Sequence, residues 1–380
     1  MLLEAGIWIG ISTLIHYAWF RKKTEREKID LVFKNIKYGF QDQLPYYFKT
    51  IKSDTCNTYI YHLPYGLIDD PKLEIILQKT LNRPVKIELK NQLFIKVYHE
   101  DLNSKYNYKF IKLDNWQLPI GYSLGEELIY HDFDKIPHMT VAGATRWGKT
   151  VFMKSLMTHF IENHPNDVEF FILDLKGGLS FHRYANIKQV KVVASNYKES
   201  ASALQMVEQE IKQTMQQFKS NYQENILDTK INKRKFIIID EAGELVPNNS
   251  MSDEDKFNAK ICQRIMSHIV RVSGGLGYRM IFGTQYPTAK IMDNQIKANS
   301  SAKISFKLET STQSNVAIDQ DGAEKLEYPG RAIYKTVHEH VVQTFFINSD
   351  EMWRRLRRYE VNDSARTKKD QRREDIVTFG

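Results

Sequence analysis

The sequence is poor in cysteine and lacks the repeats and biased tracts that mark several classes of protein. Its 380 residues contain two cysteines, Cys56 and Cys262, which lie far apart and do not have the spacing of metal ligands. We therefore expect neither a disulfide framework nor a cysteine-based metal site, and interpret both thiols as packing residues in a reducing compartment. No internal repeat or low-complexity tract occurs, which excludes a repeat array. No base-reading module is recognisable, so sequence-specific binding to nucleic acid is not predicted.

The charge of the chain has one predominant sign. Lys and Arg number 54 and Asp and Glu 46, which gives a formal net charge of +8 at pH 7. A basic protein attracts polyanions such as nucleic acid or an acidic membrane surface, although charge sets affinity and encounter rate rather than the identity of the partner. The length is sufficient for two or three domains with a sizeable core.

One stretch near the N-terminus, residues 2–20, is almost free of charge. Its ionisable side chains are Glu4 and His16, and Arg21, Lys22 and Lys23 follow it directly. A helix of this length spans about 28 Å, close to the bilayer hydrocarbon thickness of about 30 Å, and the basic triplet marks the cytoplasmic side. We predict a single-pass anchor in the cell membrane with the rest of the chain in the cytoplasm. An interfacial or core-docked helix is the alternative, and a cleaved signal peptide fits less well because no positive charge precedes the run.

The most informative motif lies at residues 143–150, which fit the pattern G-x-x-x-x-G-K-[ST]. Its glycines let successive backbone N–H groups point into one concavity, Lys149 reaches the β- and γ-phosphates, and the Thr150 hydroxyl ligates Mg²⁺. An apolar strand pattern precedes the motif and a helical pattern follows it, as a phosphate-binding loop requires, whereas a glycine turn that binds nothing is the alternative. We therefore predict ATP and Mg²⁺ as cofactors. The predicted nucleotide ligands in this loop are Gly143, Ala144, Thr145, Arg146, Trp147, Gly148, Lys149 and Thr150.

Two later strand patterns end in polar residues that suit the same site. Residues 236–239 are apolar and lead into Asp240 and Glu241. Asp240 suits a place just outside the direct ligands of Mg²⁺, and Thr150 and Asp240 are the predicted metal residues. Glu241 suits the base that orients and deprotonates the attacking water. Gln285 follows a third strand pattern, where its amide is placed to sense the γ-phosphate; a capping turn is the alternative. The predicted catalytic residues are Lys149, Glu241 and Gln285.

The order of patterns predicts the fold class. The predicted parts are an anchor at 1–20, a juxtamembrane connector at 21–49, a small α+β domain at 50–117, an α/β domain at 118–350 and a basic tail at 351–380. The small domain follows from a strand, helix and hairpin pattern at 59–63, 71–81 and 85–98. In the α/β domain, strand patterns alternate with helical ones such as 197–221 and 255–272, which is typical of a mainly parallel sheet covered on both faces. The strand patterns lie at 139–142, 168–174, 190–193, 236–240, 278–283, 304–308 and 342–347.

These motifs resemble the FtsK/SpoIIIE family of DNA translocases over about residues 118–348. The matching segments are Pro137-His138-Met139, the loop 143–150, Asp174-Leu175-Lys176-Gly177-Gly178, Asp240-Glu241, Thr284-Gln285-Tyr286-Pro287, Ile296-Lys297-Ala298-Asn299 and Gly322-Ala323-Glu324-Lys325-Leu326. The resemblance implies a RecA-like P-loop ATPase that forms a ring, a hexamer, and moves DNA without regard to its sequence. The small domain and anchor resemble short members on conjugative elements of Gram-positive bacteria, which implies a coupling protein with a relaxase and conjugation-channel proteins as partners.

The chain departs from the family at positions where arginines are usual. Lys303, Lys307 and Asn315 stand at three of them, and Gly275-Leu276 replaces an Arg-Ala pair. An arginine supplied in trans contributes several powers of ten in rate where it operates, so its identity is open. The arginines of the α/β domain that lie near motifs are Arg271, Arg279 and Arg331.

DNA contacts are expected from two basic features. Lys176, beside a glycine pair, could couple nucleotide state to DNA or to a neighbouring subunit, although a plain loop lysine is the alternative. The tail could bind phosphates or anionic lipid, or be solvated. Its basic residues are Arg354, Arg355, Arg357, Arg358, Arg366, Lys368, Lys369, Arg372 and Arg373. Two rival functions remain: a type VII-like motor that secretes protein, and a nucleotide-gated scaffold with little turnover.

Overall fold

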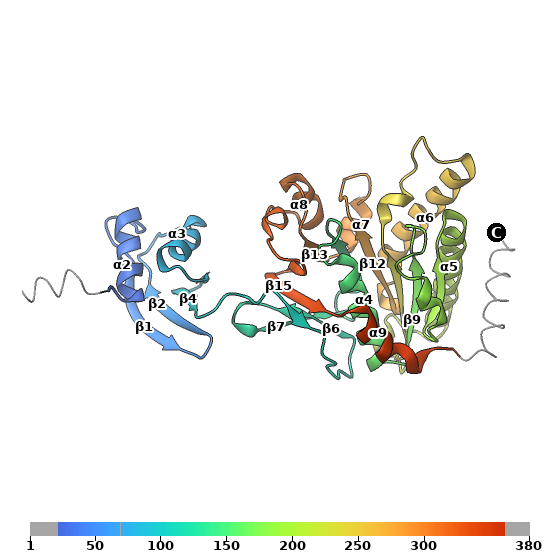
Figure 1. Ribbon diagram of the computed structural model, residues 1–380, viewed down its shortest axis with the longest axis horizontal. Helices are drawn as coiled ribbons and strands as arrows, with labels where there is room; N and C mark the ends of the chain where they lie inside the picture. The colour runs from blue at the N-terminus through green and yellow to red at the C-terminus, as the bar shows by residue number, and fades with distance from the viewer. Residues whose placement is uncertain (1–21, 69, 293, 362–380) are drawn as a thin grey trace, which may run out of the picture. The chain divides into compact units, whose positions relative to one another are not determined.

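The computed structural model describes residues 22–68, 70–292 and 294–361. The chain divides into two compact units, one of residues 1–101 with Leu124–Glu126 and one of Leu102–Ser123 with residues 127–380 (Figure 1). The predicted anchor lies outside the described residues and stays a prediction. Among the residues that are described, no helix has the length and apolar character needed to cross a bilayer.

The first unit is a small α+β domain built on a four-stranded antiparallel sheet of order β1-β2-β4-β3. Its core contains residues from both helices and from the covered face of the sheet, among them Phe33, Leu77 and Ile95. The elements are α2 (Glu25–Ile36), β1 (Tyr46–Lys52), β2 (Cys56–His62), α3 (Lys72–Leu81), β3 (Val85–Leu89) and β4 (Leu93–Tyr98).

The predicted boundaries of this domain need correction. Residues 21–49 are not a separate connector, because α2 and the start of β1 belong to the domain. Thr24 caps α2 in a capping box with Glu27, and Ile29, Val32 and Phe33 are buried in the domain core. An amphipathic helix is stabilised by covering its apolar stripe, and this sheet supplies the cover. The domain also ends at residue 101 rather than 117, because the following segment joins the sheet of the second unit.

The second unit contains an eleven-stranded sheet that is mainly parallel, which confirms the predicted mixed α/β class. Ten strands run in the order β10-β9-β11-β12-β8-β13-β14-β15-β6-β7, and β5 pairs with β15. The six strands from β10 to β13 are parallel to one another, whereas the pairs from β13 to β7 along that order are antiparallel. The strands are β5 (Tyr106–Asn107), β6 (Gln117–Tyr122), β7 (Leu128–Asp132), β8 (Met139–Ala142), β9 (Val168–Leu173), β10 (Val190–Ala194), β11 (Arg234–Ile239), β12 (Tyr278–Thr284), β13 (Ala302–Phe306), β14 (Arg331–Lys335) and β15 (Glu339–Phe346).

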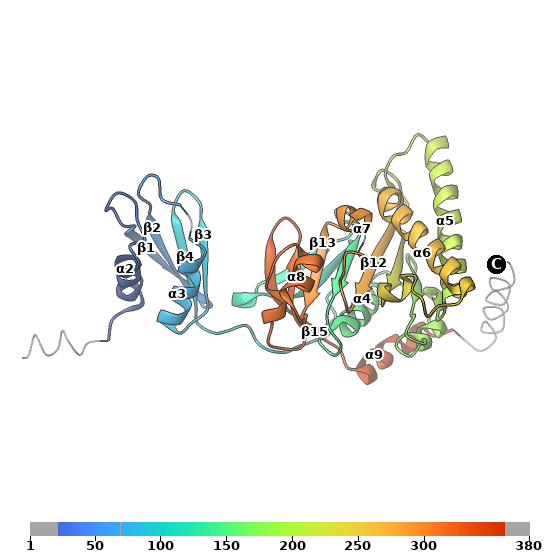
Figure 2. The ribbon, with the colours of Figure 1, turned by 90° about the horizontal axis from the view of Figure 1, so that it is seen from above.

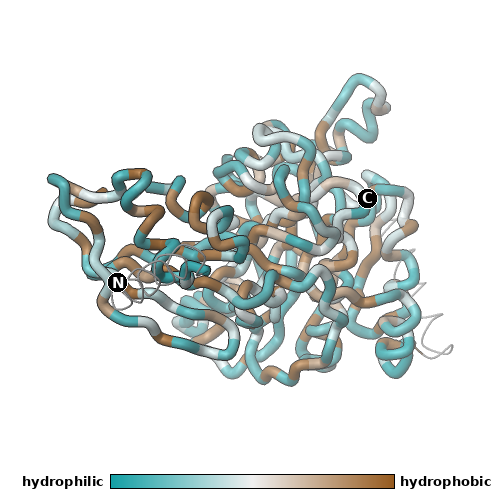
Figure 3. Tube along the Cα trace, turned by 60° about the vertical axis from the view of Figure 1, so that its left-hand side comes forward, coloured by the Kyte–Doolittle hydropathy of each residue, from teal (hydrophilic) through white to brown (hydrophobic). Residues whose placement is uncertain are grey.

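Helices cover both faces of the parallel part of this sheet. Side chains alternate between faces along a strand, so Phe236 and Ile238 pack in one core with α4, while Ile237 and Ile239 pack in a second core with α5 and α6. Burial on both faces explains the nearly continuous apolar runs of the central strands. Figure 2 shows α5 and α6 together on one side of the unit, and Figure 3 shows hydrophobic stretches distributed along the chain of both units. The helices are α4 (Lys149–Asn163), α5 (Tyr197–Ser220), α6 (Asp253–Val272), α7 (Asn294–Asn299), α8 (Ser311–Ile318) and α9 (Ser349–Leu356).

The C-terminal part of the described chain is folded, contrary to the prediction of a tail from residue 351. Helix α9 is followed by a 3-10 turn, Arg357–Tyr359. Met352 and Leu356, one helical turn apart, are fully buried in the core that contains α4, and Arg355 lies 3.2 Å from the Glu162 carboxylate of α4. Trp353 and Tyr359 are half-buried against the same core. Two fully buried residues one turn apart are too short a pattern to be detected as a helical period. The part of the tail beyond residue 361 lies outside the described residues.

Candidate functional site

The predicted phosphate loop connects β8 to α4 in a conformation that requires glycine. Gly148 has a φ of 118°, and a Cβ atom on Gly143 would lie 2.7 Å from the Cβ of Phe306. Larger residues are therefore excluded at both positions. Helix α4 begins at Lys149 without a side-chain cap, which leaves the first backbone N–H groups of the helix available to an anion.

The strand order brings three strand ends to this loop. β12 lies between β8 and β11, so one strand separates the two that carry the loop and the carboxylates. Because parallel strands end at the same edge of a sheet, Lys149, Asp240 and Gln285 all lie at that edge. β9, which leads into Asp174, lies on the far side of β11.

Lys149, Thr150 and Asp240 are in direct contact. The Lys149 ammonium donates to the backbone carbonyl of Asp240 and lies 3.0 Å from its Oδ1 atom, and the Thr150 hydroxyl is 3.5 Å from the same atom. Lys149 and Asp240 are both buried. One hydroxyl and one carboxylate fit Mg²⁺, which keeps several waters and takes its other ligands from phosphate oxygens.

Glu241 lies at the centre of a hydrogen-bond network that extends to the phosphate loop. Its Oε1 atom accepts from the Thr284 hydroxyl and from the backbone N–H of Gln285, both at 3.0 Å. The Gln285 side-chain oxygen accepts from the Thr145 hydroxyl at 2.9 Å. Thr284 does form a capping turn, because its hydroxyl accepts from the backbone N–H of Tyr286 at 3.2 Å. The Gln285 side chain takes no part in this turn and contacts the phosphate loop. Gln285 is therefore placed to connect the loop to Glu241.

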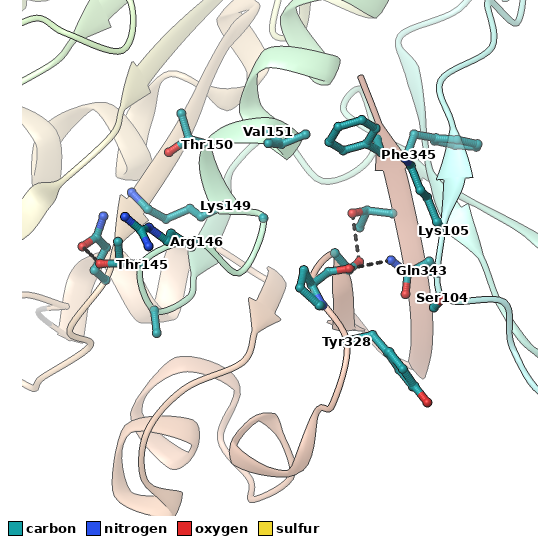
Figure 4. A pocket seen from close by; sticks show the side chains of 17 residues that line it. Ser104, Lys105, Thr145, Arg146, Lys149, Thr150, Val151, Tyr328, Gln343 and Phe345 are labelled. Atoms are coloured by element: carbon teal, nitrogen blue, oxygen red, sulfur yellow. Dashed lines mark hydrogen bonds between the residues drawn. The ribbon is translucent and has the colours of Figure 1, made fainter. Parts of the chain in front are cut away.

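A cavity of about 490 Å³ opens beside the loop (Figure 4). In the figure the loop residues lie on one side of it, and Tyr328, Gln343 and Phe345 lie on the other. The aromatic wall suits the base of a nucleotide, because aromatic rings provide flat apolar contact area. The lining residues that the sequence did not indicate are Ser104, Lys105, Val151, Tyr328, Pro329, Gly330, Gln343, Thr344, Phe345 and Phe346.

The second wall of the cavity is attached to the loop by a backbone hydrogen bond. The N–H of Gly330 donates to the carbonyl of Trp147 at 2.9 Å. Within the wall, the Gln343 side chain donates to the carbonyl of Pro329 at 2.9 Å. Lys105 lies over the ring of Phe346, with 4.4 Å between its Nζ atom and the ring centroid. The turn at Tyr328-Pro329-Gly330 is visible in the sequence, but its contact with the loop depends on pairing between distant strands.

Two of the three candidate trans arginines are held within their own chain. Arg279 is 1% exposed and donates to Asp134 at 2.7 Å, and burial lowers the pKa of its guanidinium to about 10. Arg331 is buried and donates to the backbone carbonyl of Leu102 at 2.8 Å. Arg271, in the last turn of α6, is exposed. Of the three, Arg271 is the one whose side chain is open to a neighbouring subunit.

The other side chains discussed from the sequence also have definite places. Arg146 is exposed, whereas Trp147 is half-buried with the Lys307 ammonium 4.9 Å from its ring centroid. Lys303 pairs with the Asp319 carboxylate. Lys303 and Lys307 are therefore both engaged within their own chain, and neither is presented as an exposed cation to a neighbouring subunit.

Comparison with known proteins shows what the larger unit is similar to. Residues 111–266 match the FtsK/SpoIIIE family model. The DNA translocase FtsK of Clostridium acetobutylicum is 28% identical over 314 residues, which are 76% of this chain and 39% of that protein. The ESX secretion system protein YukB of Bacillus subtilis is 28% identical over 250 residues, 60% of this chain and 16% of that protein. The chain thus spans well under half the length of either relative.

Solved structures show the same fold. The pCW3 conjugation coupling protein TcpA, in its monomer form with ATPgS, superposes with a TM-score of 0.64 at 20% identity, covering 88% of this chain and 99% of that one. The cytoplasmic domain of the type VII secretion ATPase EccC of Thermomonospora curvata gives a TM-score of 0.56 at 16% identity, covering 67% and 32%. The phosphate loop and the strand order thus lie in a unit of which residues 111–266 match the FtsK/SpoIIIE family model.

Proposed function

We propose that this chain is an ATP-dependent DNA translocase, anchored in the cell membrane, that delivers DNA to a conjugative transfer channel as a coupling protein. The observation that carries the proposal is the gathering of Lys149, Asp240 and Glu241 at one edge of the sheet, beside a cavity with an aromatic wall. The superposition on a conjugation coupling protein over 99% of that chain supports the finer assignment.

The geometry supports hydrolysis of ATP by direct attack of water. Lys149 and the N-terminus of α4 neutralise phosphate charge, and Thr150 and Asp240 would hold Mg²⁺, which supplies further charge neutralisation when bound. Glu241 orients the attacking water and accepts its proton. Gln285, in contact with Thr145 and, through its backbone, with Glu241, would report the state of the γ-phosphate to the base.

The proposal includes assembly and partners. Ring formation, as a hexamer, would place an arginine of one subunit at the site of the next, and the exposed Arg271 is the candidate. The net charge of +8 favours binding to DNA phosphates without reading bases. A relaxase and conjugation-channel proteins are proposed as further partners.

A protein-secretion motor is the second candidate function, because YukB and EccC are also similar to this chain. Their similarity covers 16% and 32% of those proteins, whereas the coupling protein is covered almost completely. A nucleotide-gated scaffold is the third candidate, and the intact contacts of Lys149, Thr150 and Asp240 argue against it.

ATP hydrolysis by the full-length protein in detergent tests these functions. DNA of any sequence should bind and raise turnover, and its affinity should fall about a thousandfold between 50 and 200 mM salt if about six phosphates are contacted. Binding is measured by fluorescence anisotropy with DNA of several unrelated sequences. Lys149→Ala is the control that shows how much of the measured ATP hydrolysis depends on the nucleotide site. If DNA at low salt neither binds nor stimulates, while a secreted polypeptide does, the secretion motor replaces the proposal.

The membrane anchor is tested separately by extraction. With residues 2–20 spanning the bilayer, full-length protein should stay in the membrane fraction after carbonate and high salt, and deletion of residues 1–20 should release it. Release of the intact protein by salt alone would show an electrostatically held surface helix instead.

A further inference from the structure

The loop that follows β9 contacts the proposed general base. Lys176 lies in this loop, and its Nζ atom is 3.4 Å from the Oε2 atom of Glu241. We propose that Lys176 is a positioning residue that holds Glu241 in a resting state and so keeps ATP hydrolysis slow until the loop moves. The inference rests on the proposed ATPase activity and adds a control element to it.

Lys176 is the exposed member of an otherwise buried set of partners. The Thr284 hydroxyl donates to the other oxygen of Glu241, Oε1, and the Gln285 N–H donates to both oxygens; these two partners belong to the end of a central strand and to the residue that follows it. The Glu241 side chain is 6% exposed, whereas that of Lys176 is 36% exposed. The ion pair with Lys176 places an ammonium at the Oε2 atom and restrains the orientation of the carboxylate, so this oxygen is less open to an attacking water. Withdrawal of Lys176 would therefore free Oε2 to orient that water without moving the strand.

Lys149 does not take over this role. It lies 3.9 Å from the same Glu241 oxygen, but it is bound to the carbonyl and the carboxylate of Asp240. A lysine at this position of a phosphate loop directs its charge to the phosphates when nucleotide is bound. With nucleotide bound, Lys176 is then the cation that pairs with the Glu241 carboxylate.

The loop is anchored at its base and open at its tip. The buried carboxylate of Asp174 accepts from the backbone N–H groups of Ser180 and Phe181, both at 2.9 Å. Between these anchors, Gly177 has a φ of 73° and no atom within 4 Å of where a Cβ would stand, and Leu179 is 82% exposed. Few buried contacts mark a segment that opens at low cost. DNA or a neighbouring subunit that touched the tip would thus move Lys176 and leave the anchors in place.

Steady-state ATPase assays of the full-length protein test the proposal through Lys176→Met. Without DNA, turnover should rise about threefold, as expected for loss of a partly exposed ion pair, and stimulation by DNA should fall by the same factor. ATP affinity should be unchanged, because Lys176 does not line the cavity. Lys176→Arg should restore slow basal turnover. Lys198→Met is the matched control, since Lys198 is an exposed lysine in the first turn of α5.

A second variant moves the loop and keeps the charge. Gly177→Ala forces a side chain onto left-handed backbone and so favours another loop conformation. Basal turnover should therefore again rise. If Lys176→Met lowers turnover or leaves it unchanged in a protein that binds and hydrolyses ATP, the proposal is overturned. Wild-type protein that binds ATP but does not hydrolyse it would instead overturn the proposed function, and this inference with it.

Discussion

Replacing Glu241 with glutamine is expected to lower ATP turnover by about a hundredfold or more while ATP binding is retained. Glutamine keeps the shape of the side chain and an oxygen that accepts from Thr284 and from the Gln285 N–H, but it does not take a proton from water. Glu241 also does not line the cavity, so the contacts that bind nucleotide remain. Turnover is measured by phosphate release, and affinity by titration of a fluorescent ATP analogue.

Lys149→Ala is the matched variant for this experiment. It removes the buried cation that faces the phosphates, so ATP affinity itself should fall by about tenfold or more. The two variants thus separate chemistry from binding. An equal loss of nucleotide affinity in both would contradict the roles assigned to Glu241 and Lys149, because it would place both side chains in binding alone.

Deletion of residues 349–380 is expected to lower the free energy of unfolding of the larger unit by about 4 kcal/mol or more relative to deletion of residues 362–380. The longer deletion removes α9, whose Met352 and Leu356 are fully buried against α4. It also removes the Met352 sulfur, which accepts from the Tyr184 hydroxyl at 3.0 Å, and the Arg355 partner of Glu162.

Urea denaturation followed by tryptophan fluorescence measures both deletions. The shorter deletion also removes Arg366, Lys368 and Arg372, so its DNA affinity should fall uniformly across sequences if these residues contact phosphate, while stimulation of ATPase activity survives. Equal unfolding free energies for the two deletions would show that α9 contributes nothing to the core. A deletion that begins at residue 353 would remove half of α9, which ends at Leu356. Its effect on DNA binding would then be mixed with a loss of stability.

Features that depend on short stretches of chain were predictable. The loop from Gly143 to Thr150 is recognised because glycines, a lysine and a hydroxyl residue at fixed spacing are needed within one turn. β8, β3 and β4 end where their alternation or apolar run ends, so their bounds agree with the predicted ones. Strand ends at Asp240 and Gln285 were likewise local patterns, and the parallel sheet places such ends at one edge.

Features that depend on contacts between distant segments were decided by the tertiary structure. Tyr328 and Lys105 reach the cavity because β5 and β14 pair with β15, and a pattern of period two does not state which strands become neighbours. Burial of Arg279 beside Asp134 and the contact of Lys176 with Glu241 join residues 145 and 65 positions apart (279 − 134 and 241 − 176). The residue types of the site follow from the sequence alone, whereas the partners of each side chain follow from packing, because contacts across strands and loops have no fixed spacing in the chain.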